Sequence, residues 1–206
     1  MEYSKIDKLG VNPSLLGFGC MRFPKKEDGT IDEVEAERML DHAIESGVTY
    51  IDTAYPYHDG ESEPFVGRVL KKYKREDFYL ATKLPMFKID SLEQAKEIFE
   101  EQIKRLDVDY VDFYLLHALN KDTWKKVIDL NIIPYCEELK KQGRIKNFGF
   151  SFHDDYEVFE EIINYRDWDF CQIQLNYIDT DIQAGMKGYK LTEEKNVPLV
   201  IMEPIK

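Results

Sequence analysis

Four residues that can donate, accept or hold a proton lie at or just after the ends of predicted β-strands. Asp52 is in the last part of one β-branched run, and Tyr57 follows it by five residues. Lys83 and His117 end the next two runs of this kind. The carboxyl ends of neighbouring parallel strands share one edge of a sheet, so we expect the four side chains to lie in one pocket.

These four residue types suit the reduction of a carbonyl group. A tyrosine can protonate a developing alkoxide, but an ordinary pKa near ~10 makes it a slow acid at neutral pH. An ammonium group at Lys83 is predicted to lower the pKa of Tyr57, and Asp52 to keep that ammonium charged and oriented. His117 is predicted to hydrogen-bond the substrate oxygen. No side chain of the four can deliver a hydride, so this chemistry needs a nicotinamide cofactor.

Each of these residues also has an ordinary structural interpretation. A carboxylate after a strand often caps a loop, and a tyrosine in a chain with 13 of them usually packs in the interior. The occurrence of all four at the ends of three successive strands favours a catalytic site. Metal-dependent hydrolysis would normally need a His-x-His pair at the end of the first strand, where the sequence has Gly19-Cys20-Met21, so we expect no metal site.

Composition narrows the class of protein. The chain has 206 residues, 43% of them hydrophobic, and no apolar stretch near the ~20 residues that cross a bilayer, so we expect no membrane association. The net charge of −12 argues against nucleic-acid binding. Three cysteines without a Cys-x-x-Cys pair favour a reduced, cytoplasmic location. The oligomeric state stays open.

Strands and helices are predicted to alternate along the whole chain. The predicted strands are 15–20, 49–53, 78–83, 111–117, 145–152, 170–175 and 197–202. The predicted helices are 33–46, one after Ser62, 92–106, 133–141, one around 158–163 and one before Lys195, with a polar loop after His117. This pattern predicts one α/β domain over 1–206, a (β/α)8 TIM barrel that ends near its seventh strand. We therefore expect an incomplete barrel and a chain truncated at its C-terminus. A doubly wound open sheet is the alternative, but no Gly-x-Gly-x-x-Gly follows the first strand.

Several motifs in this order resemble the aldo/keto reductase superfamily. The matching segments are 16–20, 47–54 with Tyr57, Gly60-Glu61-Ser62-Glu63, 81–83, 109–117, 149–151 and 172–176. Segments 20–24 and 117–120 also resemble a bacterial or archaeal branch whose longer members carry a C-terminal iron–sulfur segment. The resemblance implies an NAD(P)H-dependent oxidoreductase that reduces an aldehyde or ketone, a small carbonyl substrate, and it assigns the catalytic roles to the four residues described above.

The resemblance also implies where the cofactor binds. Ser151 and Gln172 match positions that bind the nicotinamide carboxamide, and Met202 lies near a position where many members stack an aromatic ring. The family often has asparagine after that serine; here Phe152 follows, and then His153. NADP is the usual cofactor, and NAD is possible. A non-catalytic cofactor-binding or regulatory subunit is the alternative function.

Overall fold

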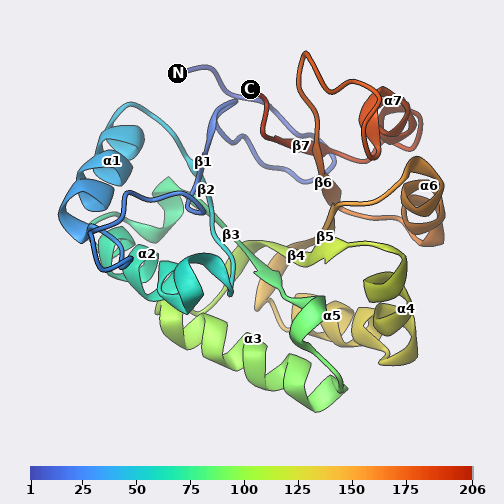
Figure 1. The fold of residues 1–206 in the computed structure, drawn as a ribbon, viewed down its shortest axis with the longest axis horizontal. Helices are drawn as coiled ribbons and strands as arrows, with labels where there is room; N and C mark the ends of the chain where they lie inside the picture. The colour runs from blue at the N-terminus through green and yellow to red at the C-terminus, as the bar shows by residue number, and fades with distance from the viewer. Residues whose placement is uncertain (206) are drawn as a thin grey trace. The chain divides into compact units, whose positions relative to one another are not determined.

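The computed structural model describes residues 1–205, which contain seven β-strands alternating with α-helices (Figure 1). The strands are β1 (Gly17–Gly19), β2 (Tyr50–Asp52), β3 (Tyr79–Leu84), β4 (Val111–Leu119), β5 (Ile145–Phe152), β6 (Phe170–Gln174) and β7 (Leu199–Met202). They follow one another in chain order, and the pairs β1–β2, β2–β3, β5–β6 and β6–β7 are parallel. This is the predicted α/β fold, with seven of the eight strands of a (β/α)8 barrel in the described part of the chain.

Helices connect the strands, as parallel pairing requires. They are α1 (Glu33–Glu45), α2 (Ser62–Leu70), α3 (Leu92–Leu106), α4 (Lys121–Asp129), α5 (Ile132–Lys141), α6 (Tyr156–Tyr165) and α7 (Gly185–Glu194). Three short 3-10 helices are η1 (Tyr57–Gly60), η2 (Arg75–Asp77) and η3 (Met86–Lys88). None of the helices described over residues 1–205 is long and apolar enough to cross a membrane.

The chain divides into two compact units. The first comprises Met1–Leu84 and Lys96–Phe113, and the second comprises Pro85–Ala95 and the chain from Tyr114 onward. In the first unit, the register pairs Gly19 with Asp52 and Asp52 with Ala81, so β2 runs between β1 and β3.

An aromatic cluster fills the interior of the second unit. The ring of Phe150 lies 4.9 Å from that of Trp168, and the ring of Phe152 lies 5.3 Å from that of Phe159. All four side chains are fully buried. Burial of such large apolar groups is the main source of stability in a domain of this size.

The first strand is shorter than predicted. Leu15 and Leu16, expected in an apolar strand over 15–20, are 67% and 59% exposed. The hydroxyl of Ser14 donates a hydrogen bond to the carbonyl of Leu16, which bends the chain before β1 begins at Gly17. The apolar run therefore predicted a strand but not its starting residue.

The segment after β4 is a helix and not the predicted polar loop. Asn120 caps α4: its side chain accepts from the amide of Thr123, and the Thr123 hydroxyl accepts from the amide of Asn120. Trp124 and Val127 supply the buried face. The apolar residues of α4 are few and lie among charged ones, so the sequence gives only a weak helical pattern here.

Candidate active site

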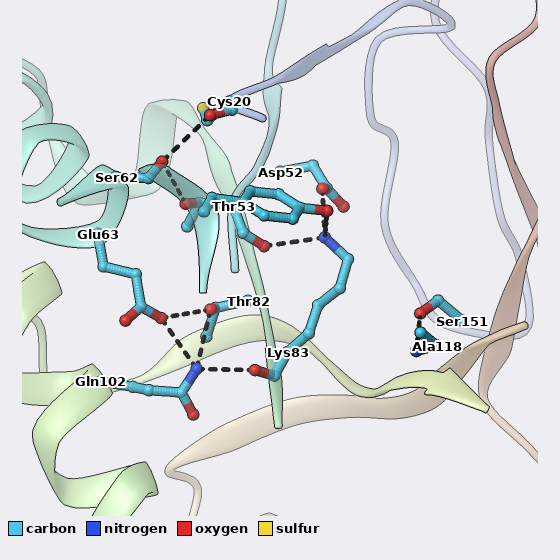
Figure 2. A network of polar contacts seen from close by, with 11 residues as sticks. Cys20, Asp52, Thr53, Ser62, Glu63, Thr82, Lys83, Gln102, Ala118 and Ser151 are labelled. Carbon is cyan, nitrogen blue, oxygen red and sulfur yellow. Dashed lines mark hydrogen bonds and ion pairs between the residues drawn. The ribbon is translucent and has the colours of Figure 1, made fainter. Parts of the chain in front are cut away.

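Asp52, Tyr57 and Lys83 meet in the first unit, around the Lys83 ammonium. Figure 2 shows the bonds from this ammonium to Asp52 and to the carbonyl of Thr53. Lys83 Nζ donates to Asp52 Oδ1 at 2.5 Å, to the backbone carbonyl of Thr53 at 2.9 Å and to the Tyr57 hydroxyl at 3.2 Å. The Lys83 side chain is almost fully buried. Three acceptors match the three N–H groups of an ammonium, so its position is fixed.

The strand register brings these side chains together. Asp52 on β2 pairs with Ala81 on β3, and Lys83 lies two residues further along β3, on the same face of the sheet. The amide of Thr53 continues the pairing by donating to the carbonyl of Ala81. Tyr57 begins η1, and its amide donates to the carbonyl of Ala54, so a tight turn folds the phenol back toward β3.

Burial and charge act in opposite directions on the two titrating groups. Burial lowers the pKa of Lys83, but Asp52 and Tyr57 more than offset it, so that pKa is raised. Burial raises the pKa of Tyr57, and the lowering by Lys83 does not overcome it. The predicted lowering by Lys83 is therefore present, but the expected net direction is wrong because the phenol is largely buried.

The backbone directly after Tyr57 has an unusual conformation. His58 and Asp59 have φ values of 52° and 56°, in the left-handed region that few non-glycine residues adopt. The ring Nε2 of His58 accepts a hydrogen bond from the amide of Phe23 at 3.1 Å. This contact ties the Tyr57 loop to the segment after β1. No signal in the sequence identified it.

His117 belongs to the second unit, near the carboxyl end of β4. Its ring is mostly buried and lies 5.7 Å from the ring of Phe87. Its role toward a substrate stays a prediction.

The three candidate cofactor residues lie on one face of β5, β6 and β7. The register pairs Ser151 with Gln172, and it pairs Gln174 with Met202. Residues two apart on a strand point to the same side, so Ser151, Gln172 and Met202 share that side. Ser151 and Gln172 are buried, whereas Met202 is partly exposed.

Ser151 also has a structural role. Its Oγ accepts a hydrogen bond from the amide of Ala118 at 2.8 Å, where the backbone takes a φ of 52° (Figure 2). A hydroxyl that accepts this bond keeps its own hydrogen for another acceptor. This bond to β4 is therefore compatible with a contact between Ser151 and a cofactor.

The position after Ser151 does not supply a polar group. Phe152 is fully buried against Phe159, and the side chain of His153 is exposed. Gln174, which the sequence pattern did not single out, is buried on the same face as Gln172. Its Nε2 donates to Asp179 Oδ2 at 3.4 Å.

Neither a metal-binding cluster nor a surface hollow adds a candidate site in the described part of the chain. Across residues 1–205, no group of three or more His, Cys, Asp or Glu side chains is arranged to hold a metal ion. A surface hollow in the second unit is lined by the beginnings of α6 and α7 and the segment before α7, and none of the candidate residues lines it.

Comparison with known proteins identifies the family. The model of the aldo/keto reductase family matches residues 15–206. The chain belongs to the aldo/keto reductase family. It is 32% identical over 155 residues to probable aldo-keto reductase 1 of Glycine max, covering 71% of this chain and 44% of that protein. It is 34% identical over 125 residues to the aldo-keto reductase YhdN of Bacillus subtilis, covering 57% of this chain and 38% of that protein.

Solved structures agree with this assignment. The holo form of the aldo-keto reductase AKR11C1 from Bacillus halodurans superposes with a TM-score of 0.78 at 30% identity, covering 98% of this chain and 65% of that one. The part of the chain that matches the two curated relatives spans less than half of the length of each. These relatives are all named as aldo-keto reductases. The relation to an iron–sulfur branch stays a prediction.

Two residues near the site of this aldo/keto reductase received no role from the sequence. Glu63 counted only as part of a motif, and Gln102 was not singled out. Both are fully buried, and both contact Thr82 beside Lys83. Gln102 falls on the apolar stripe of α3, where a lone amide is a signal that could have been read.

Proposed function

We propose that this aldo/keto reductase reduces an aldehyde or ketone to the alcohol, with hydride from NADPH and with Tyr57 as the general acid. The observation that supports this most directly is the position of Lys83 Nζ, 2.5 Å from Asp52 Oδ1 and 3.2 Å from the Tyr57 hydroxyl. This arrangement provides a phenol that can lose a proton beside a fixed positive charge.

Protonation of the substrate follows from these contacts. Tyr57 donates its hydroxyl proton to the oxygen of the carbonyl as negative charge develops there, and a phenolate remains. The Lys83 ammonium stabilises that phenolate, and Asp52 keeps the ammonium charged in a buried site. A phenol is protonated at neutral pH, so the acid is available before each turnover. Solvent then returns the proton to Tyr57, which is partly exposed.

His117 has a separate role in this proposal. A neutral imidazole N–H can donate a hydrogen bond to the carbonyl oxygen, which orients the substrate and stabilises the charge that develops. The residue receives this role from its place near the carboxyl end of β4 and from the family resemblance.

The residues of β5, β6 and β7 suit a nicotinamide. The Ser151 hydroxyl can donate to the carboxamide oxygen, the Gln172 amide can donate or accept, and the Met202 thioether offers an apolar, polarisable contact. When bound, the nicotinamide supplies the hydride that no side chain can provide. NADPH is favoured because it is the usual cofactor of the family, and NADH is the alternative.

We place this activity in the cytoplasm. Cys20, Cys136 and Cys171 are all free and buried, as expected of a protein that works in a reducing compartment. Burial raises the pKa of each thiol, so these cysteines have little nucleophilic thiolate at neutral pH.

The test compares Tyr57→Phe with Tyr55→Phe while the absorbance of NADPH is followed against a panel of aldehydes and ketones. Tyr57→Phe should lower kcat by at least about 100-fold, the usual size of a general-acid contribution. Tyr55 is a matched control, because its hydroxyl donates to the carboxylate of the exposed Glu101 at 2.7 Å.

The same experiment separates the alternative function. If all three proteins bind NADPH equally by fluorescence titration and none shows carbonyl-dependent oxidation of NADPH, the chain is a cofactor-binding or regulatory subunit. Equal turnover by wild type and Tyr57→Phe would refute the role of Tyr57 as general acid.

A further inference from the structure

The segment Gly60-Glu61-Ser62-Glu63 resembles the family but has no part in the proposed chemistry. Ser62 and Glu63 are the first two residues of α2, and both are completely buried. A buried carboxylate costs free energy unless several partners satisfy it. Two buried polar residues side by side next to the candidate site therefore need an explanation.

Ser62 is bonded to the end of β2. Its hydroxyl donates to the carbonyl of Cys20 at 3.2 Å and lies 2.9 Å from the Thr53 hydroxyl (Figure 2). A serine hydroxyl has one hydrogen, so Thr53 is the donor in the second bond. The carbonyl of the same Thr53 accepts from Lys83 Nζ. Ser62 thus helps to fix one of the three acceptors of the ammonium.

Glu63 is bonded to the end of β3. Its Oε1 accepts from the Thr82 hydroxyl at 2.6 Å and from Gln102 Nε2 at 2.9 Å. Gln102 Nε2 also lies 3.0 Å from the carbonyl of Lys83, so the backbone of the lysine itself is held (Figure 2). The network reaches Lys83 from the backbone side, whereas Asp52 and Tyr57 contact its ammonium.

The location of Glu63 makes its burial tolerable. It lies in the first turn of α2, where free backbone N–H groups and the helix dipole favour a negative charge. Arg105 Nη1 lies 3.6 Å from its second oxygen. Burial still raises the pKa of Glu63 despite these partners. Burial of the Glu63 carboxylate costs free energy, so this residue is better suited to holding its neighbours in position than to stabilising the fold.

We propose that Ser62 and Glu63 are positioning residues that hold the ends of β2 and β3, so that the Lys83 ammonium reaches Asp52 and Tyr57 together. The hydrogen bonds of Ser62 and Glu63 are observed in the structure, and their effect on turnover rests on the proposed function.

The test uses Thr82, because valine and serine at this position separate shape from hydrogen bonding. Thr82→Val keeps the branched shape and loses the bond to Glu63, whereas Thr82→Ser keeps the hydroxyl. The readout is the titration of the Tyr57 phenol by NMR with ¹³C-labelled tyrosine, with the signal assigned by its absence in Tyr57→Phe. This readout needs neither cofactor nor substrate.

We expect Thr82→Val to raise the Tyr57 pKa by about 0.5–1 unit, because a displaced Lys83 stabilises the phenolate less. Thr82→Ser should titrate like wild type. A second pair of variants tests Glu63. Glu63→Leu should raise the Tyr57 pKa as Thr82→Val does, whereas Glu63→Gln should titrate like wild type, since glutamine keeps an acceptor oxygen for Thr82 and Gln102. Spectra are compared only at pH values where circular dichroism shows each variant folded.

Ser62→Ala removes the bonds to Cys20 and Thr53 and should raise the Tyr57 pKa in the same way. Equal Tyr57 titration in wild type, Ser62→Ala, Thr82→Val and Glu63→Leu, with all four proteins folded, would overturn the positioning role and leave a structural one. The outcome is independent of catalysis. If Thr82→Val shifts the titration but wild type does not oxidise NADPH with any carbonyl compound, the positioning stands and the proposed function fails.

Discussion

The two units hold their candidate groups by different means. In the first, Lys83 and Asp52 form an ion pair that is almost completely withdrawn from solvent, with Tyr57 and the carbonyl of Thr53 completing the ammonium's contacts. In the second, Ser151, Gln172 and Met202 are neutral and are aligned by strand register, and the bond from the Ala118 amide to Ser151 is between neutral groups.

This difference is what the two proposed tasks require. A group that transfers a proton must have its charge states set by neighbours that do not move, and buried charges do this strongly. A side chain that only recognises a neutral amide must point toward it and have a free hydrogen or lone pair. Strand register and a single hydrogen bond are enough to orient such a side chain. The first arrangement should therefore be far more sensitive to the loss of a single side chain than the second.

The largest effect is expected from Lys83→Met. Removal of one partner leaves the mostly buried Asp52 carboxylate without its counter-charge, which should lower the free energy of unfolding by about 3–5 kcal/mol. It should also abolish measurable carbonyl reduction, because Tyr57 loses the ammonium that stabilises its phenolate. Urea denaturation and NADPH consumption measure the two effects.

Asp52→Asn combined with Lys83→Met is the matched control. The double variant no longer buries an isolated charge, so it should be clearly more stable than Lys83→Met alone. If the double variant loses as much free energy of unfolding as the two single variants added together, the two residues are not coupled.

A smaller effect is expected in the second unit from Gln172→Leu. Loss of one neutral hydrogen bond to the cofactor should weaken binding of NADPH by about 10-fold, which corresponds to ~1.4 kcal/mol. The Tyr57 titration should stay at its wild-type value. A Kd equal to that of wild type in fluorescence titration would remove Gln172 from the cofactor site.

A further comparison concerns α4 of the second unit, where the cap is also neutral. Asn120→Ala removes the acceptor for the Thr123 amide and should lower the free energy of unfolding by about 1 kcal/mol. Asn120→Asp keeps an acceptor and should cost less. Equal losses for alanine and aspartate would show that the cap contributes little.

The smallest effect is a slope at alkaline pH. The folded-state pKa of Lys83 is raised above its unfolded value, so its contribution to stability is complete below about pH 10 and is lost as the pH rises through the folded pKa. Tyr57, also raised, adds to the same loss. Urea midpoints measured upward from pH 9 should fall more steeply for wild type than for Lys83→Met; parallel curves would contradict the assignment.

The order of strands and the candidate site residues could be predicted from the sequence, because both depend on local patterns. Runs with Asp52, Lys83 and His117 at or near their ends predicted the strands. Tyr57 was a candidate because it follows Asp52 by five residues and can donate a proton, and the family resemblance assigned it the same role. The polar network behind Lys83 could not be predicted in the same way, since Gln102 comes from a distant helix. The direction of the shift in the Tyr57 pKa depends on how deeply the phenol is buried in the fold. The left-handed backbone at His58 likewise has no signal in the local sequence.

The proposed chemistry depends on the action of the buried Lys83 ammonium on the Tyr57 phenol. The most direct test is the pKa of Tyr57 in wild type and in Lys83→Met, read from its ¹³C-labelled ring carbon. The pKa should be higher in Lys83→Met, because burial then acts without the opposing charge. A Tyr57 pKa that is unchanged or lower in a folded Lys83→Met protein would contradict the account.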